Sequence, residues 1–231
     1  MIQISNLSKK YGETVVFSDL NYTFENACIY GLVGRNGAGK TTLLNILSNY
    51  DKNYTGVISI DRKKMNKVDY LDMPVAYAMD QPSFFNELTI YENLLLIASS
   101  RKIKKQEAFD KIERILDGLG LKKYENYSPL ELSKGTMQRL NNACAMIQEE
   151  KITIFDEPFS GLDPVQMKLL ENVIVEFHKK EKGIYIISSH DIECLQNVCD
   201  KCLLLHNGQI REINMEDVGR EEIAKILSEG E

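Results

Sequence analysis

Short apolar runs alternate with longer amphipathic segments along most of the chain. The apolar runs have the length of buried β-strands, and the segments between them repeat apolar residues every three or four positions, as helices do. This alternation predicts an α/β fold with a mostly parallel core sheet and crossover helices. The predicted strands of that sheet are residues 27–33, 75–79, 152–155, 184–188 and 202–205.

Two regions depart from this alternation. Residues 1–26 and 56–61 contain β-prone pieces and little helical periodicity, so we expect them to form an antiparallel β annex. Between residues 86 and 147 the apolar spacing is helical throughout, which predicts a helical subdomain of approximately residues 86–147. Length and pattern together predict one domain over residues 1–231.

Two charged segments receive structural interpretations. Residues 102–105 carry three lysines and are predicted to form a solvated turn or helix start. Residues 216–231 are predicted to form a short amphipathic helix with an acidic tail, to which we assign no function.

The composition narrows the classes of partner. The 28 Lys and Arg residues are outnumbered by 34 Asp and Glu residues, which gives a net charge of −6. Sequence-independent binding to nucleic acid requires a surplus of cations, so we expect no nucleic-acid partner. The longest purely apolar run, Leu94–Ala98, is far shorter than the roughly 20 residues that cross a bilayer. The first residues lack the pattern of a secretory signal, and we therefore expect a cytoplasmic protein.

Five scattered cysteines fit reduced thiols better than a disulfide framework. Cys194, Cys199 and Cys202 have the spacing C-x4-C-x2-C, which matches three of the four ligands of a plant-type iron–sulfur site. A fourth thiolate would have to come from distant Cys28 or Cys144. The favoured interpretation is structural, with the first two cysteines on a helix and Cys202 at the start of a strand.

A glycine-rich loop connects the first predicted core strand to a helix-like segment. It matches the Walker A pattern G-x-x-x-x-G-K-[ST], in which backbone N–H groups and the helix N-terminus surround a phosphate. We expect Lys40 to neutralise the β- and γ-phosphates and Thr41 to provide a hydroxyl ligand to Mg²⁺. A plain strand-to-helix turn is the alternative, which the eight-residue match disfavours. The predicted nucleotide-binding residues of this loop are Gly34, Arg35, Asn36, Gly37, Ala38, Gly39, Lys40, Thr41 and Thr42.

Two acidic residues end a predicted buried strand far downstream. The ends of such strands are where α/β folds present groups to ligands. Asp156 is positioned to hold Mg²⁺ through water, and Glu157 to act as general base on the attacking water. A solvated turn is the alternative for this pair alone, but its combination with a Walker A loop favours a metal site.

Two short segments match motifs of GTPases. Residues 66–69 match the guanine-reading box N-K-x-D, and residues 117–120 match D-x-x-G. In GTPases D-x-x-G comes first, whereas here it follows, in a helical stretch. We interpret both matches as coincidence.

Four further motifs resemble those of a known family. Residues 132–139, Leu-Ser-Lys-Gly-Thr-Met-Gln-Arg, are similar to the L-S-G-G-Q signature of ABC ATPases and precede the Asp156–Glu157 strand. The order and spacing of the other three also look like those of an ABC nucleotide-binding domain, from about residue 11 to residue 208. They are Gln81-Pro82, Ser160-Gly161-Leu162-Asp163 and Ser188-Ser189-His190-Asp191.

The resemblance implies roles for four side chains outside the loop. Tyr11 would stack on adenine, Gln81 would bind Mg²⁺ and sense the partner, His190 would contact the γ-phosphate, and Asp163 would reach across a dimer interface. The alternatives are a strand-end aromatic for Tyr11, an ordinary turn for Gln81 and a structural histidine for His190. A hydrolase triad of residues 189–191 is disfavoured, because adjacent residues on an extended segment face opposite ways.

The signature departs from the family pattern at two places. Lys134 replaces the first of the paired glycines, and Thr136 replaces the usual glutamine. Ser133 and Gly135 remain, so a hydroxyl and a bare backbone at a helix N-terminus can still approach a γ-phosphate. We expect hydrolysis to survive, slowly or only with a partner.

The resemblance also implies partners. A second ATPase subunit, identical or different, would cover the ATP and Mg²⁺ bound by the first, and an integral membrane permease subunit would hold the pair at the cytoplasmic face of the cell membrane. Phe84 and Phe85, just after Gln81, either dock on that permease or belong to the core. The expected function is ATP-driven transport, by a bacterial exporter. The alternative is a soluble ABC ATPase that clamps or remodels a cytosolic partner such as a cofactor-assembly scaffold.

Overall fold

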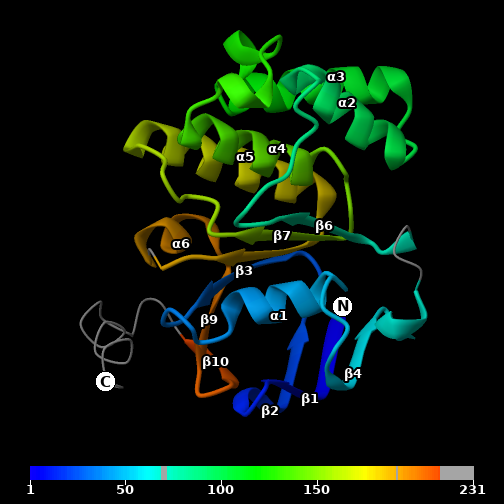
Figure 1. Ribbon diagram of the computed structural model, residues 1–231, viewed down its shortest axis with the longest axis vertical. Coiled ribbons are helices and arrows are strands. Elements are labelled where there is room, and N and C mark those ends of the chain that lie inside the picture. The colour runs from blue at the N-terminus through cyan, green and yellow to red at the C-terminus, as the bar shows by residue number, and fades with distance from the viewer. Residues whose placement is uncertain (69–71, 191, 214–231) are drawn as a thin grey trace.

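The computed structural model describes residues 1–68, 72–190 and 192–213, and Figure 1 shows two β-sheets with helices on both faces of the larger one. The larger sheet has the strand order β10-β9-β3-β8-β7-β6. Five of these strands run parallel, and β10 pairs antiparallel with β9 at one edge. This confirms the predicted mostly parallel core sheet. The strands are β3 (Cys28–Val33), β6 (Val75–Ala78), β7 (Ile152–Asp156), β8 (Ile184–Ser188), β9 (Lys201–His206) and β10 (Gln209–Ile213).

The smaller sheet is antiparallel and has the order β2-β1-β4-β5. Its three long strands come from the two regions predicted as the annex, which is thereby confirmed. Helix α1 (Lys40–Leu47) lies between the two sheets (Figure 1), and its apolar residues share one buried cluster with side chains from both. The strands of this sheet are β1 (Ile2–Tyr11), β2 (Thr14–Phe24), β4 (Thr55–Ile60) and β5 (Lys63–Lys64).

Helices α2 to α6 cover the other face of the larger sheet and form a second buried cluster with it (Figure 1). Residues 86–147 form helices and connecting loops, and their assignment as a subdomain of a single domain stays a prediction. The helices are α2 (Ile90–Ser100), α3 (Lys105–Gly118), α4 (Lys134–Met146), α5 (Pro164–Glu181) and α6 (Ile192–Val198), with short 3₁₀ helices η1 (Met65–Lys67), η3 (Lys122–Tyr124) and η4 (Pro129–Glu131).

Smaller expectations meet mixed outcomes. The charged segment 102–105 forms a turn that leads into α3, as predicted. Asp69 of the guanine-box match, Asp191 and the predicted helix over residues 216–231 lie outside the described residues. None of the helices in the described part of the chain is long and apolar enough to span a bilayer.

The cysteines have structural surroundings. Cys194 lies on α6, Cys199 directly follows that helix, and Cys202 is the second residue of β9 rather than its first. Across the described ranges, no three His, Cys, Asp or Glu side chains gather as ligands of a metal ion, so the iron–sulfur hypothesis finds no support. Burial raises the pKa of the Cys202 thiol to about 11, which keeps it protonated near neutral pH.

The first turn of α2 holds the loop that precedes it. Thr89 caps the helix: its hydroxyl accepts the N–H of Glu92, and the carboxylate of Glu92 accepts the N–H of Thr89. The buried side chain of Asn93 accepts the N–H of Phe85 at 3.0 Å. Its amide also donates to the carbonyl oxygens of Phe85 and Leu88. One asparagine therefore fixes both ends of residues 85–88.

We expect Asn93→Ala to lower the free energy of unfolding by about 1–3 kcal/mol, because the buried asparagine makes several hydrogen bonds to the backbone of residues 85–88 that alanine cannot make. Urea denaturation measures this change. Asn86→Ala is the control, since the side chain of Asn86 is exposed, and it should change the free energy by less than about 0.5 kcal/mol. Equal losses in the two variants would contradict the role assigned to Asn93.

Candidate functional site

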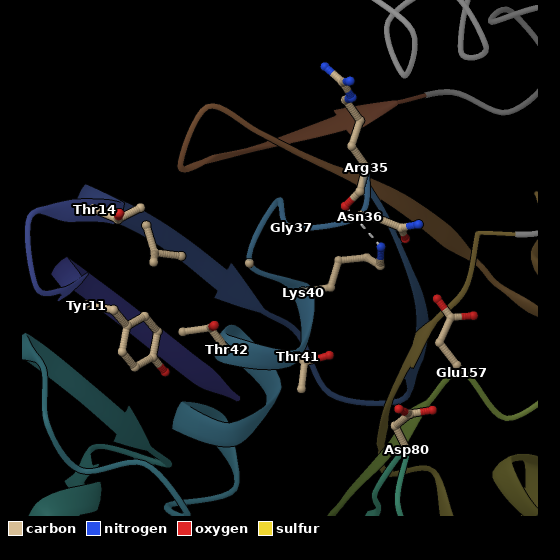
Figure 2. Close-up of a pocket in the computed structure, with 12 residues that line it drawn as sticks. Tyr11, Thr14, Arg35, Asn36, Gly37, Lys40, Thr41, Thr42, Asp80 and Glu157 are labelled. Atoms are coloured by element: carbon tan, nitrogen blue, oxygen red, sulfur yellow. Dashed lines mark hydrogen bonds between the residues drawn. The ribbon is translucent and has the colours of Figure 1, made fainter. Parts of the chain in front are cut away.

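A cavity of about 460 Å³ lies at the loop between β3 and α1. Figure 2 shows that residues from the first hairpin, from this loop and from the ends of β6 and β7 surround it. The lining residues are Tyr11, Thr14, Val16, Arg35, Asn36, Gly37, Gly39, Lys40, Thr41, Thr42, Asp80 and Glu157.

The backbone of the loop has no room for side chains at two of its glycines. Gly39 has a φ of 100°, and a Cβ atom there would lie 2.6 Å from Cγ1 of Val16. A Cβ atom at Gly34 would lie 2.7 Å from the carbonyl oxygen of Leu205. The loop therefore packs tightly against the strands behind it, while the first residues of α1 line the cavity, where a helix N-terminus favours an anion.

Lys40 is the first residue of α1, and its ammonium group is held inside the loop. The Nζ atom donates to the carbonyl oxygens of Gly34 at 2.7 Å and of Arg35 at 3.3 Å, and only 8% of the residue is exposed. The N–H of Ala38 donates to the carbonyl of Arg35 and closes the turn. Gly34 and Ala38 thus shape the loop without lining the cavity.

The acidic pair at the end of β7 is hydrogen-bonded by a hydroxyl at the end of the neighbouring strand β8. Asp156 is 1% exposed; its Oδ1 atom accepts from the hydroxyl of Ser188 at 2.5 Å and its Oδ2 atom from the hydroxyl of Tyr77 at 3.3 Å. The same Ser188 hydroxyl accepts the N–H of Glu157 at 2.9 Å. Ser188 therefore connects both acidic residues to β8.

Glu157 contacts His190, the residue predicted to contact the γ-phosphate. Nδ1 of His190 lies 2.9 Å from Oε2 of Glu157, and a carboxylate only accepts, so Nδ1 carries the proton that is donated. The side chain of His190 is 71% exposed and that of Glu157 is 20% exposed. The imidazole thus contacts the carboxylate that lines the cavity, and most of its own surface is open to solvent.

The donors around the cavity fit Mg²⁺. Thr41, Asp80 and Glu157 line the cavity with oxygen atoms, and Asp156 directly precedes Glu157 at the end of β7. Over the described ranges they do not form a ready cage of three metal-binding side chains. This suits an ion that takes one or two protein oxygens and completes its shell with water and phosphate oxygens.

Tyr11 stands at the far end of the cavity from Glu157 (Figure 2) and is 52% exposed. Its hydroxyl donates to Oδ2 of Asp51 at 3.1 Å, and Nζ of Lys9 lies 2.7 Å from that oxygen and 4.5 Å from the ring centroid. Burial alone would raise the pKa of Asp51, but hydrogen bonds from Lys9, the N–H of Asn53 and Tyr11 lower it below its usual value. An ionised Asp51 thus holds the ring in place.

Sequence reasoning missed three lining residues. Thr14 and Val16 lie on β2, and Thr14 pairs directly with Tyr11 across the first hairpin, so the short gap between the two strands was the available signal. Asp80 was missed because the resemblance drew attention to the next residue, Gln81. Gln81 is exposed and does not line the cavity, whereas Asp80 does.

The two remaining predicted residues lie elsewhere. Ser133 is the N-cap of α4, where its hydroxyl accepts the N–H of Thr136, and Gly135 lies in the first turn. A Cβ atom at Gly135 would lie 2.9 Å from the carbonyl oxygen of Gly161, so no larger residue fits. Neither Ser133 nor Gly135 lines the cavity around Lys40.

Comparison with known proteins points to one family. The family profile described as ABC transporter matches residues 17–160. An uncharacterized ABC transporter ATP-binding protein of Methanocaldococcus jannaschii is 31% identical over 95% of this chain and 79% of its own length. The tungstate uptake system ATP-binding protein TupC of Peptoclostridium acidaminophilum is 30% identical over 91% of this chain and 97% of its own length. The bacitracin transport ATP-binding protein BcrA of Enterococcus faecalis is 30% identical over 94% of this chain and 70% of its own length.

Solved structures share the fold. An ATP-binding subunit of an ABC transporter superimposes with a TM-score of 0.85 at 27% identity, over 100% of this chain and 95% of its own. A bacterial ABC transporter cassette whose structure is dimeric gives a TM-score of 0.82 at 23% identity, over 93% of this chain and 99% of its own length.

We expect Ser188→Ala to reduce ATP turnover about tenfold or more and to lower the free energy of unfolding by about 1–3 kcal/mol, since the variant leaves the N–H of Glu157 and the buried carboxylate of Asp156 without this hydroxyl. Phosphate release and urea denaturation measure the two effects. Ser99→Ala is the control, because Ser99 is an exposed residue of α2 far from the cavity in sequence and fold. Normal turnover of Ser188→Ala would contradict the positioning role of Ser188.

Proposed function

Since the chain belongs to the ABC transporter family, as an ATP-binding and ATP-hydrolysing subunit, we propose that it powers a membrane transporter by closing on a second ATPase subunit when both hold ATP. We further propose that it works at the cytoplasmic face of the cell membrane, bound to an integral membrane permease subunit.

One observation carries the proposal of closure: the residues expected to contact one ATP molecule lie on two separate surfaces of the chain. Lys40, Thr41 and Glu157 line the cavity, and Ser133 and Gly135 do not. A second copy turned to face the first would bring its Ser133–Gly135 turn over the cavity. The phosphates would then lie between Lys40 of one subunit and a helix N-terminus of the other, and both favour negative charge.

The chemistry of the closed site follows from the side chains. The N–H groups of the loop and the ammonium of Lys40 would hold the β- and γ-phosphates. The carboxylate of Glu157, oriented by His190 at 2.9 Å, would hold the attacking water and accept its proton. Mg²⁺, when bound through Thr41 and through water on Asp156, would supply positive charge to the phosphate oxygens. Loss of the γ-phosphate removes the charge that attracts the facing helix, and the pair reopens.

Exposed apolar side chains support docking on a permease. Phe84 packs against the helical core, but Phe85 is 59% exposed. Tyr127 and Leu130 are 45% and 76% exposed. Their segment adjoins the one with Phe85, because the hydroxyl of Ser128 donates to the carbonyl of residue 86 at 2.8 Å. We propose that Phe85, Tyr127 and Leu130 contact an apolar helix end of the membrane subunit.

The direction of transport stays a prediction. By their names, one similar protein serves tungstate uptake and another bacitracin transport, at equal identity to this chain. Export is therefore proposed on the signature departures at Lys134 and Thr136 alone.

We expect Glu157→Gln to form a dimer in the presence of ATP and Mg²⁺, because the amide keeps the shape of the carboxylate but cannot accept a proton from water, so ATP stays intact. Light scattering after gel filtration measures the mass. Lys40→Ala combined with Glu157→Gln is the control and should remain monomeric, because the γ-phosphate loses its cation. A monomeric Glu157→Gln protein at saturating ATP would contradict ATP-driven closure.

We expect Phe85→Glu to abolish co-purification of a multispanning membrane protein with the tagged chain, since a charge at the centre of an apolar contact is desolvated without a partner. Val57→Glu, at a 39% exposed position on β4, is the matched control and should retain that protein. Mass spectrometry of the captured material identifies it. Equal capture by both variants would contradict docking through Phe85, and capture of a soluble scaffold alone would support the clamping ATPase instead.

A further inference from the structure

The backbone on either side of Asp80 is fixed by side chains of two helices. The carbonyl oxygen of Met79 accepts from the amide of Asn141 at 2.7 Å, and Asn141 is a buried residue of α4. On the other side, Asn93 of α2 binds the N–H and the carbonyl of Phe85. With the chain held at residues 79 and 85, Asp80 faces the cavity and Gln81 does not.

Asp80 lies close to the end of the strand that carries the proposed metal-binding carboxylate. Strand β6 pairs with β7, with Ala78 opposite Phe155, so the chain leaves β6 toward Asp80 beside the point where β7 reaches Asp156. Asp80 lines the same cavity as Thr41 and Glu157. Figure 2 shows the carboxylate of Asp80 below Thr41 and Glu157, on the side where β6 and β7 end.

We propose that Asp80, and not Gln81, is the side chain that binds the Mg²⁺ accompanying ATP at this end of the cavity, together with the hydroxyl of Thr41. The proposal rests on the proposed function, because it takes nucleotide in this cavity as given. A carboxylate oxygen is a harder and more negative ligand than an amide oxygen, and Mg²⁺ prefers such ligands.

A charged ligand at residue 80 has an effect that a neutral one lacks. Without a metal ion, Asp80 adds a negative charge beside the triphosphate and repels it, while Arg35 and Lys40 are cations that line the cavity from the loop. With the metal ion, the same charge attracts the ion and strengthens nucleotide binding. Removal of the charge should therefore change metal-free and metal-bound affinity in opposite directions.

Two measurements on the full chain test this. In the first, a fluorescent ATP analogue is titrated in EDTA and in excess Mg²⁺. We expect Asp80→Asn to bind the analogue about tenfold more tightly in EDTA and to lose most of the gain that Mg²⁺ gives the unmodified chain. Gln81→Ala should behave like the unmodified chain in both buffers.

In the second measurement, free Mn²⁺ is followed by electron paramagnetic resonance while the protein is titrated with a non-hydrolysable ATP analogue present. We expect Asp80→Asn and Asp80→Ala to weaken Mn²⁺ retention about tenfold, and Gln81→Ala to leave it unchanged. The readout is metal affinity and does not depend on turnover. Asp80 is exposed, so we expect both variants to fold, and circular dichroism checks this.

The outcomes separate the inference from the function on which it rests. If the unmodified chain shows no saturable binding of the analogue in either buffer, the proposed function fails. If the unmodified chain binds it, but Gln81→Ala loses Mn²⁺ while Asp80→Asn keeps it, the assignment to Asp80 is overturned. The same holds if Asp80→Asn binds no more tightly in EDTA than the unmodified chain.

Discussion

The carboxyl ends of four parallel strands meet at one edge of the larger sheet, and this constraint decides where the chemistry takes place. Strand β3 leads into the phosphate loop, β6 into Asp80, β7 ends at Asp156, and β8 leads to His190. Parallel strands require crossover helices, which separate these groups widely in the sequence. The sheet brings them together because each connection returns the chain to the same starting edge.

Three side-chain amides of α4 connect this edge of the sheet to the Ser133–Gly135 turn at the start of the same helix. Gln138 donates to the carbonyl of Glu157 at 3.4 Å, Asn141 to that of Met79 at 2.7 Å, and Asn142 to that of residue 158 at 3.1 Å. All three belong to the helix that Ser133 caps. A shift of α4 on closure would therefore act directly on the backbone beside Asp80 and Glu157. Buried amides are costly to leave unpaired, so the helix and both loops are expected to move as one body.

The fold and most of the cavity could be predicted from the sequence because they depend on local pattern. Strand length, helical spacing and the loop of residues 34–41 are each encoded in neighbouring residues. The position of a side chain just after a strand is not encoded in neighbouring residues, because it depends on which backbone groups are hydrogen-bonded by distant helices. The resemblance thus assigned the metal to Gln81, which stays a prediction, whereas Asp80 is the residue that lines the cavity, next to the Met79 carbonyl that Asn141 binds. Thr14 was missed for a similar reason, since only the hairpin register pairs it with Tyr11.

The consecutive acids pose a geometric problem that the backbone solves. Adjacent residues of an extended strand point to opposite sides, yet Asp156 and Glu157 are both proposed to serve one site. Asp156 keeps the strand geometry and is buried against Ser188, whereas Glu157 has a φ of 50°, in the left-handed region. That conformation costs a non-glycine residue roughly 1–3 kcal/mol. The hydrogen bond from the N–H of Glu157 to Ser188 offsets part of the cost, so the hydroxyl that fixes one acid also stabilises the turn that aims the other at the cavity.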